Sequence, residues 1–275
     1  MIVWLNGRCL GAEAARIDPS DRGLLLGDGL FETMRAVDGR VPLLDRHLRR
    51  LREAAAILGV PLDPDDRGIA AACAAVLEAN GLTAAALRLT LTRGPGPRGL
   101  LPPVDPRPTL LLAAFPLPPP PPPARAVVSR ATRRNERSPL SRLKTLGYLD
   151  NLIALEEACS AGADDALLLN TAGDLACATT ANLFLVEGDA LLTPRVEDGA
   201  LPGITRGRVL ELANGLALAC REERLPPERL AKAGGALLTS SLIGIRPLVA
   251  VDGRRIGAGI PHPLAERLQG AWVRW

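Results

Sequence analysis

Lysine is almost absent from this 275-residue sequence, since Lys144 and Lys232 are the only lysines among 33 basic residues and all the others are arginine. Histidine is equally scarce, with only His47 and His262, which argues against a histidine-based metal site and against a Ser-His-Asp triad. The five cysteines are dispersed without a C-x-x-C pair, which argues against a disulfide framework and against structural zinc. We therefore predict a protein without a metal site.

Aromatic residues make up only 3% of the chain, too few for a base-stacking platform, and the basic residues are not clustered. With a net charge of only +3, these features argue against nucleic-acid binding. No apolar run reaches the roughly 18 residues that a membrane span needs. The N-terminal residues 1–11 lack the charged and apolar regions of a signal peptide. The sequence thus predicts a soluble cytoplasmic protein with no membrane partner.

The scarcity of lysine makes the chemistry of Lys144 and Lys232 worth considering. The chain is rich in Ala, Leu and Pro, a bias that also replaces lysine with arginine wherever only positive charge is needed. Arginine cannot serve where an amine must lose a proton and attack a carbonyl. Each remaining lysine is therefore a candidate nucleophile, and survival by chance is the alternative.

Six consecutive prolines at residues 118–123 form the sharpest boundary in the chain. Such a run favours a stiff polyproline II segment. Because it lies between two strand-like stretches, we interpret it as a linker rather than as a ligand for a proline-recognition domain. We predict an N-terminal domain at residues 1–115, a linker at 116–124 and a C-terminal domain at 125–275.

Turn signals and hydrophobic spacing predict an α+β organisation. Asn6-Gly7 marks one hairpin, and Asp38-Gly39 marks a second one between strands at residues 30–37 and 40–44. Asp45 is the predicted N-cap of a helix that ends before Gly59. Further helices are expected at residues 66–80, 147–161, 204–213 and from about 262, and strands at 85–92, 108–115, 166–170, 182–186, 191–193, 216–221 and 236–239.

Three segments carry residues suited to chemistry. In SRLKTLGYLDN, leucines surround Lys144, and burial lowers a lysine pKa, as a Schiff-base lysine requires. In LPGITRGRVLEL, Ile204 and Thr205 open a helix whose backbone N–H groups form an anion site, unless it is an ordinary capped helix. In LLTSSLIGIRPL, Ser240 and Ser241 follow a buried strand and suit a phosphate, unless they are only turn residues.

Taken together, these segments resemble the class IV aminotransferases. The run from Asn182 to Arg206 contains N-L-F, L-L-T and L-P-G-I-T-R in the order of that family's signature. Residues 21–35, DRGLLLGDGLFETMR, resemble its D-R-G-x-x-x-G-D-G-x-[FY]-E motif. LDRHLRRLREAA is similar to the segment with the phosphate-binding arginine, and KTLGYLDN to the segment with the Schiff-base lysine. The resemblance covers nearly the whole chain.

The resemblance implies a two-domain fold like that of D-amino-acid aminotransferase. A small α/β N-terminal domain and a larger barrel-like C-terminal domain would hold pyridoxal 5′-phosphate (PLP) between them, in a homodimer with residues from both subunits in each site. Lys144 would carry the cofactor and then move protons at the substrate Cα. The other residues that the resemblance implies are Arg50, Ile204, Thr205 and Ser240 or Ser241 for the phosphate, Tyr148 for the O3′ atom, and Phe31 for the substrate.

One position departs from the family's pattern. Five residues before N-L-F the family has a glutamate that keeps the pyridine nitrogen protonated, and this chain has Cys177 there. A neutral thiol is a weak partner for that nitrogen. Asp174 lies three residues away, on the opposite face of a strand, so we do not expect it to substitute. Reduced or absent turnover in a PLP-fold protein is therefore one hypothesis.

Residues 92–100, TRGPGPRGL, resemble a segment of 4-amino-4-deoxychorismate lyases, with Leu100 in place of their tyrosine. These enzymes release pyruvate and leave 4-aminobenzoate, a folate precursor, and this reaction is the first expectation for the small-molecule amino substrate. D-amino-acid aminotransferases share the arginine at Arg98 but have histidine where Leu100 stands, and branched-chain aminotransferases are more distant. Arg98 is predicted to bind a substrate carboxylate, unless it is a solvated loop arginine.

Overall fold

The computed structural model describes residues 1–273. Its chain divides into two compact units, Met1–Pro119 with Leu143–Gly147, and Pro120–Arg142 with Tyr148–Trp275. The division falls inside the proline run. It differs from the predicted boundaries 1–115, 116–124 and 125–275 because residues 143–147 pack with the first unit. Within the described part of the chain, no helix is long and apolar enough to cross a membrane.

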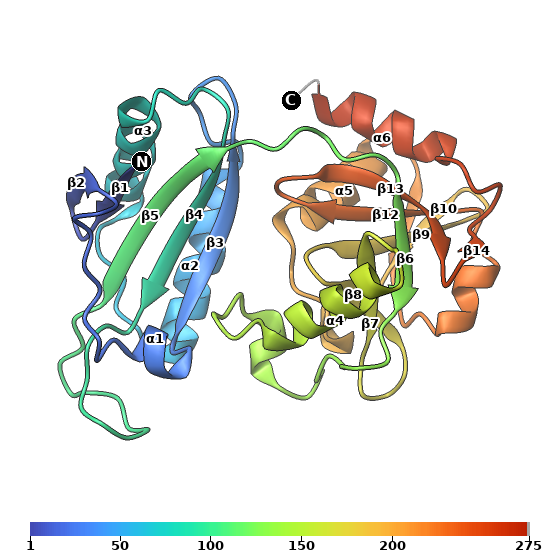
Figure 1. The fold of residues 1–275 in the computed structure, drawn as a ribbon. Helices are drawn as coiled ribbons and strands as arrows, with labels where there is room; N and C mark the ends of the chain where they lie inside the picture. Colours follow the sequence, from blue (N-terminus) through green and yellow to red (C-terminus); the bar gives the residue numbers. More distant parts are fainter. Residues whose placement is uncertain (274–275) are drawn as a thin grey trace. The chain divides into compact units, whose positions relative to one another are not determined.

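The first unit is an antiparallel five-stranded sheet in the order β2-β1-β5-β4-β3, covered by helices (Figure 1). Its strands are β1 (Ile2–Leu5), β2 (Arg8–Gly11), β3 (Gly29–Ala36), β4 (Ala85–Thr92) and β5 (Thr109–Pro116), and its helices are α1 (Arg22–Leu26), α2 (Leu44–Leu58) and α3 (Asp66–Ala79). The β1–β2 hairpin at Asn6-Gly7 is confirmed.

Side-chain alternation gives this sheet two different faces. Leu87, Leu89 and Leu91 of β4 are fully buried in one core with Leu48 and Leu51 of α2. Because side chains alternate along a strand, the residues between those leucines lie on the opposite face. That opposite face carries Arg88 of β4 and Phe31 of β3, whose contacts are described below.

The turn of the second predicted hairpin forms at Asp38-Gly39, but its second strand is wrong. Residues 40–44 form no strand, and only one bridge joins Val37 to Arg40. Instead β3 pairs with β4 along its whole length, from Gly29–Thr92 to Ala36–Ala85. Pro42 lacks an N–H group and so cannot continue a ladder along β3.

The predicted N-cap at Asp45 is also wrong. Helix α2 begins at Leu44, after Leu43 in the left-handed conformation, and no side chain caps it. Asp45 lies inside the first turn, where its negative charge still favours the helix N-terminus.

The second unit is a curled sheet of half-barrel form, nine-stranded in its described residues, in the order β11-β10-β9-β12-β13-β6-β7-β8 with β14 on β13. Its strands are β6 (Ala124–Val128), β7 (Asp165–Leu169), β8 (Leu175–Ala178), β9 (Asn182–Glu187), β10 (Ala190–Thr193), β11 (Ala219–Glu222), β12 (Gly235–Ser240), β13 (Gly244–Val251) and β14 (Arg254–Arg255). Its α-helices are α4 (Leu149–Ser160), α5 (Ile204–Gly215) and α6 (Pro263–Val273).

Helices α5 and α6 cover one face of this sheet. Phe184 of β9 and Leu237 of β12 are fully buried against Val209 of α5 and Leu268 of α6. Helix α4 packs separately, with Ala154 and Ala158 against the β7 and β8 strands. The expected α+β fold, with a small α/β N-terminal domain and a larger barrel-like C-terminal domain, is confirmed.

Candidate active site

Lys144 lies along the open edge of the first sheet. Strand β3 is the last strand of that sheet, and the segment Leu143–Gly147 runs beside it. The Phe31 N–H donates to the Lys144 carbonyl at 2.9 Å, and the Leu146 N–H donates to the Gly29 carbonyl at 3.1 Å. These backbone bonds hold the segment against β3, and the Lys144 side chain is half-buried there.

The ring of Phe31 lies under two cationic groups. The Lys144 Nζ atom is 4.2 Å from the ring centre, and the Arg88 Cζ atom is 3.9 Å from it. Phe31 is 5% exposed, whereas Arg88 is exposed. Both distances are within the range of cation–π attraction, so Phe31 contacts both an amine and a guanidinium.

Arg88 is a residue that the sequence analysis missed. No motif singles it out, and LRLTLT has only the alternation of an ordinary strand. Its place follows from the strand register, in which Arg88 pairs with Thr33 and so shares a sheet face with Phe31. The sequence could have indicated Arg88 only if the pairing of β4 with β3 had been predicted.

Arg50 belongs to a buried ionic cluster on the other face of β3. Its Nε and a terminal nitrogen donate to the two Glu32 carboxylate oxygens at 2.8 and 2.6 Å, and His47 Nδ1 lies 2.7 Å from Glu32 Oε2. Burial alone raises the pKa of Glu32, but the Arg50 charge and the bonds from His47 and Arg50 outweigh it, so the pKa lies below its ordinary value. The Arg50 guanidinium is therefore held by a charged carboxylate.

The start of α5 is one of the segments predicted to bind an anion. Its N-cap is Gly203, and no side chain caps the helix. A Cβ atom at Gly203 would stand only 2.0 Å from Asn182 Oδ1, so the turn before Ile204 needs a glycine. Asn182 also donates from Nδ2 to the Leu201 carbonyl at 2.9 Å, which fixes this turn on β9. An uncapped helix N-terminus attracts negative charge.

The end of β12 lies beside the same turn. Thr239 pairs with Asn182 across β9 and β12, and the half-buried Ser240 and Ser241 follow it. Thr239 is 1% exposed, and its Oγ1 atom has no hydrogen-bond partner within the described residues. An unpaired buried hydroxyl is costly, and its place beside an uncapped helix start fits an oxygen-rich ligand such as a phosphate.

This unpaired hydroxyl gives a stability prediction. Thr239→Val should raise the free energy of unfolding of the cofactor-free protein by about 1 kcal/mol, because it removes a buried polar atom without a partner. The control is Thr193→Val, since the Thr193 hydroxyl is also buried but donates to the Leu183 carbonyl at 2.8 Å. That variant should lose about 1 kcal/mol. Urea unfolding of both proteins checks this, and equal losses would contradict it.

Tyr148 and Cys177 are linked through α4. Tyr148 immediately precedes the helix, and Asn151 in its first turn donates to the Thr179 carbonyl at 2.6 Å, just after β8. Cys177 of β8 is 7% exposed and packs with the alanines of α4. Burial raises the pKa of the Cys177 thiol to about 11, so the group is a neutral thiol near pH 7.

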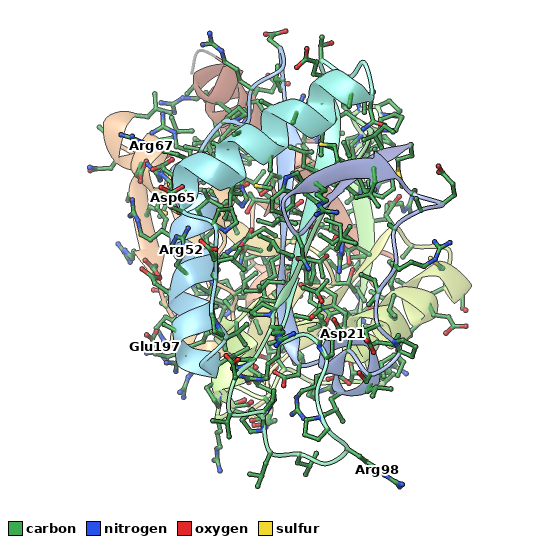
Figure 2. All side chains as sticks on the ribbon, turned by 90° about the vertical axis from the view of Figure 1, so that its left-hand side faces the viewer. Asp21, Arg52, Asp65, Arg67, Arg98 and Glu197 are labelled. Carbon is green, nitrogen blue, oxygen red and sulfur yellow. The ribbon has the colours of Figure 1, made fainter. Side chains whose placement is uncertain are left out.

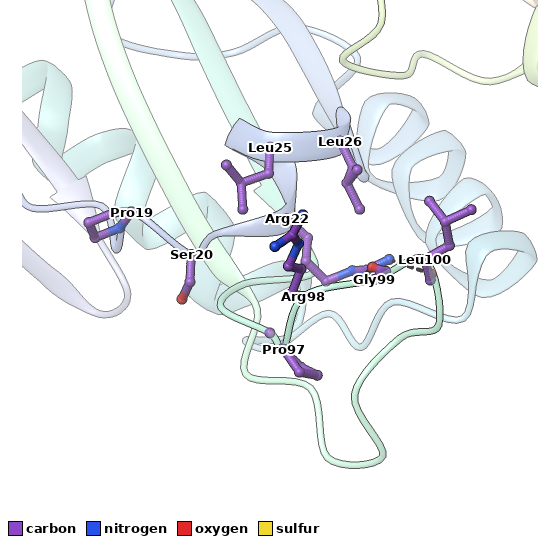
Figure 3. A pocket seen from close by; sticks show the side chains of 10 residues that line it. Pro19, Ser20, Arg22, Leu25, Leu26, Pro97, Arg98, Gly99 and Leu100 are labelled. Carbon is purple, nitrogen blue, oxygen red and sulfur yellow. Dashed lines mark hydrogen bonds between the residues drawn. The ribbon is translucent and has the colours of Figure 1, made fainter.

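Arg98 lies on the loop between β4 and β5, where it lines a cavity of about 560 Å³ (Figure 3). It is exposed and points outward at the end of that loop (Figure 2). Buried Arg22 holds the loop by donating to the carbonyls of Gly99, Leu100 and Leu101 at 3.0, 2.8 and 3.2 Å. The first unit therefore brings Lys144 to Phe31 and Arg88, and it presents Arg98 on its surface.

Known proteins match the chain from end to end. The profile of the amino-transferase class IV family matches residues 29–251. A provisionally named branched-chain-amino-acid aminotransferase of Methanocaldococcus jannaschii is 33% identical over 281 residues, covering 100% of this chain and 98% of the relative. The structure of Escherichia coli branched-chain amino acid aminotransferase matches with a TM-score of 0.94 and 29% identity, over 99% of this chain and 93% of that one. A Legionella pneumophila structure, provisionally named 4-amino-4-deoxychorismate lyase, matches with a TM-score of 0.87 and 31% identity over 96% of both chains.

Proposed function

Because this chain belongs to the class IV aminotransferase family, whose enzymes use PLP, we propose that Lys144 holds the cofactor and that the substrate is an amino acid whose amino group is transferred. The observation that carries this proposal is that the Lys144 amine and the Arg88 guanidinium both contact the ring of Phe31. An amine can bind the cofactor aldehyde, and a guanidinium can bind a carboxylate with two parallel hydrogen bonds.

We assign the remaining roles to residues of this chain. When it is bound, the cofactor supplies an electron-withdrawing ring that stabilises negative charge on the substrate Cα. Lys144 moves the proton at that carbon, and Phe31 lines the substrate-binding site. Arg50, Ile204, Thr205 and Ser240 or Ser241 hold the phosphate, and Tyr148 and Cys177 contact the ring. The buried charge on Arg50 and the uncapped start of α5 support the phosphate assignments.

Arg88 rather than Arg98 is proposed as the carboxylate partner on the same protomer. Arg88→Ala should raise the KM for the substrate about 10- to 100-fold, since a charge-assisted contact contributes about 1.5–3 kcal/mol. The matched control is Arg98→Ala, which removes an exposed arginine from the loop. A KM unchanged in Arg88→Ala but raised in Arg98→Ala would return the role to Arg98, as the sequence first suggested.

The second candidate is 4-amino-4-deoxychorismate lyase activity, which the TRGPGPRGL segment and the likeness to the Legionella structure favour. Assays should compare pyruvate release from aminodeoxychorismate with amino transfer from D- and L-amino acids, including branched-chain donors. Pyruvate release without amino transfer would replace the aminotransferase proposal by the lyase. A protein that binds PLP at Lys144 but turns over neither substrate would support the third hypothesis, reduced turnover caused by Cys177.

We also propose that the enzyme is a homodimer. The first unit exposes Leu24, Leu25 and Leu26 of α1 by 48–70%, and Leu100 and Leu101 of the neighbouring loop by more than 80%. Leu25, Leu26 and Leu100 line the same cavity, so these side chains form one apolar surface. Such surfaces are typical of protein interfaces. Sedimentation of the wild type and of Leu25→Asp tests whether this face forms the dimer.

Cytoplasmic residence and a role in folate synthesis stay predictions.

A further inference from the structure

The Cys177 side chain has apolar surroundings, at the position where the family has a carboxylate for the PLP ring nitrogen. The side chain packs among Ala154 and Ala158 of α4, and Ala166 and Leu168 of β7. Leu168 is its direct partner across the β7–β8 pair. The position that the family fills with a carboxylate therefore lies in an apolar environment here.

Two charged groups act on Cys177, and neither can replace the missing glutamate. Arg134 is a cation, and a nearby cation opposes protonation of a ring nitrogen. Asp165 is held by the protein at its Oδ1 atom, which accepts from the Ala166 N–H at 2.8 Å and from the Thr179 N–H and hydroxyl at 3.1 and 2.6 Å. Burial also raises the pKa of Asp165, so this carboxyl gives up its charge more readily than an ordinary aspartate.

Asp174, the other acid near β8, is committed elsewhere. It precedes the strand, and its carboxylate forms an ion pair with Arg224 at 3.3 Å. This contact supports the expectation that Asp174 does not substitute for the glutamate. Within residues 1–273, the acids around β8 are thus engaged in holding the protein's own structure.

We propose that this chain binds PLP with an unprotonated ring nitrogen near neutral pH, with the Cys177 thiol beside it in place of a carboxylate. The inference rests on the proposed function, in which Lys144 and Cys177 belong to the cofactor site. A neutral thiol offers at most a weak hydrogen bond to this nitrogen and no negative charge to hold a proton there. The ring then withdraws electrons less strongly than in a pyridinium-type enzyme.

The test is nitrogen NMR of the holoenzyme loaded with PLP that carries ¹⁵N in its ring. Wild type should show the resonance of an unprotonated pyridine near neutral pH. Cys177→Glu should move it to the position of a protonated pyridinium, and the matched control Cys177→Ser should leave it unmoved. A protonated nitrogen in wild type, or an unmoved resonance in a folded Cys177→Glu, overturns the inference.

A second measurement needs no variant. The 1-deaza analogue of PLP, in which a C–H group replaces the ring nitrogen, should bind wild type within about twofold of PLP itself, because no charge-assisted bond is lost. A loss of affinity of about tenfold or more would overturn the inference. Borohydride reduction and peptide mapping separate this result from the proposed function, since failure of PLP to label Lys144 overturns that function and the premise taken from it.

Discussion

Lys144→Arg should abolish covalent attachment of PLP and lower turnover by a factor of about 100 to 10,000, the usual contribution of a residue that transfers protons at the reacting atom. Arginine keeps the positive charge over Phe31, but a guanidinium does not deprotonate and cannot attack the cofactor aldehyde. The variant therefore separates the chemistry of the amine from its charge. Borohydride reduction followed by mass mapping, beside the absorbance of the purified protein, measures attachment.

Lys232→Arg is the matched control for this experiment. Lys232 is the other lysine of the sequence, and it is exposed at the end of a short turn after Ala231. This variant should keep both the reducible chromophore and full turnover. If Lys144→Arg stays coloured and the reduced cofactor maps to Lys232, the assignment of Lys144 is wrong.

Glu32→Gln should lower the free energy of unfolding by about 3–5 kcal/mol, because it removes the charge that compensates a buried cation. Glu32 is 1% exposed, and the Arg50 side chain is 11% exposed. Glutamine keeps the size of the side chain, so packing is preserved and the loss is electrostatic. Asp66→Asn is the control, since it breaks the more exposed Arg52–Asp66 pair and should cost only about 0–1 kcal/mol.

Phosphate should reverse part of the Glu32→Gln defect. If Arg50 contributes to the cofactor's phosphate site, inorganic phosphate or PLP supplies the missing negative charge and stabilises the variant more than the wild type. Thermal unfolding with and without each ligand measures this difference. An equal ligand-induced shift in both proteins would place the phosphate away from Arg50.

The same pair has a defined pH dependence. The folded pKa of Glu32 lies below its ordinary value of 4.5, so its contribution to stability is complete above that value and is lost as the pH falls through the folded pKa. The difference in stability between wild type and Glu32→Gln should therefore be largest near neutral pH and should shrink below pH 4.5. A difference that stays constant in acid would show that the defect is steric.

The sequence by itself determined the elements whose signals are local. Strand β4 follows from strict alternation, helix α3 begins at the predicted residue, and the proline run contains the division between the two units. The family was also readable from the sequence, because its motifs occur in order along nearly the whole chain. Such signals depend on neighbours a few residues apart, so no tertiary contact is needed to interpret them.

The tertiary structure alone decided which distant segments meet. It paired β3 with β4, which placed Arg88 over Phe31, and it returned residues 143–147 to the edge of β3. The sequence favoured the nearer hairpin at Asp38-Gly39, because a short loop is the simplest connection between two strands. Pro42 keeps the nearer ladder from extending beyond the Val37–Arg40 bridge, and the eight-residue pairing of β3 with β4 joins segments far apart in the chain that local patterns cannot bring together.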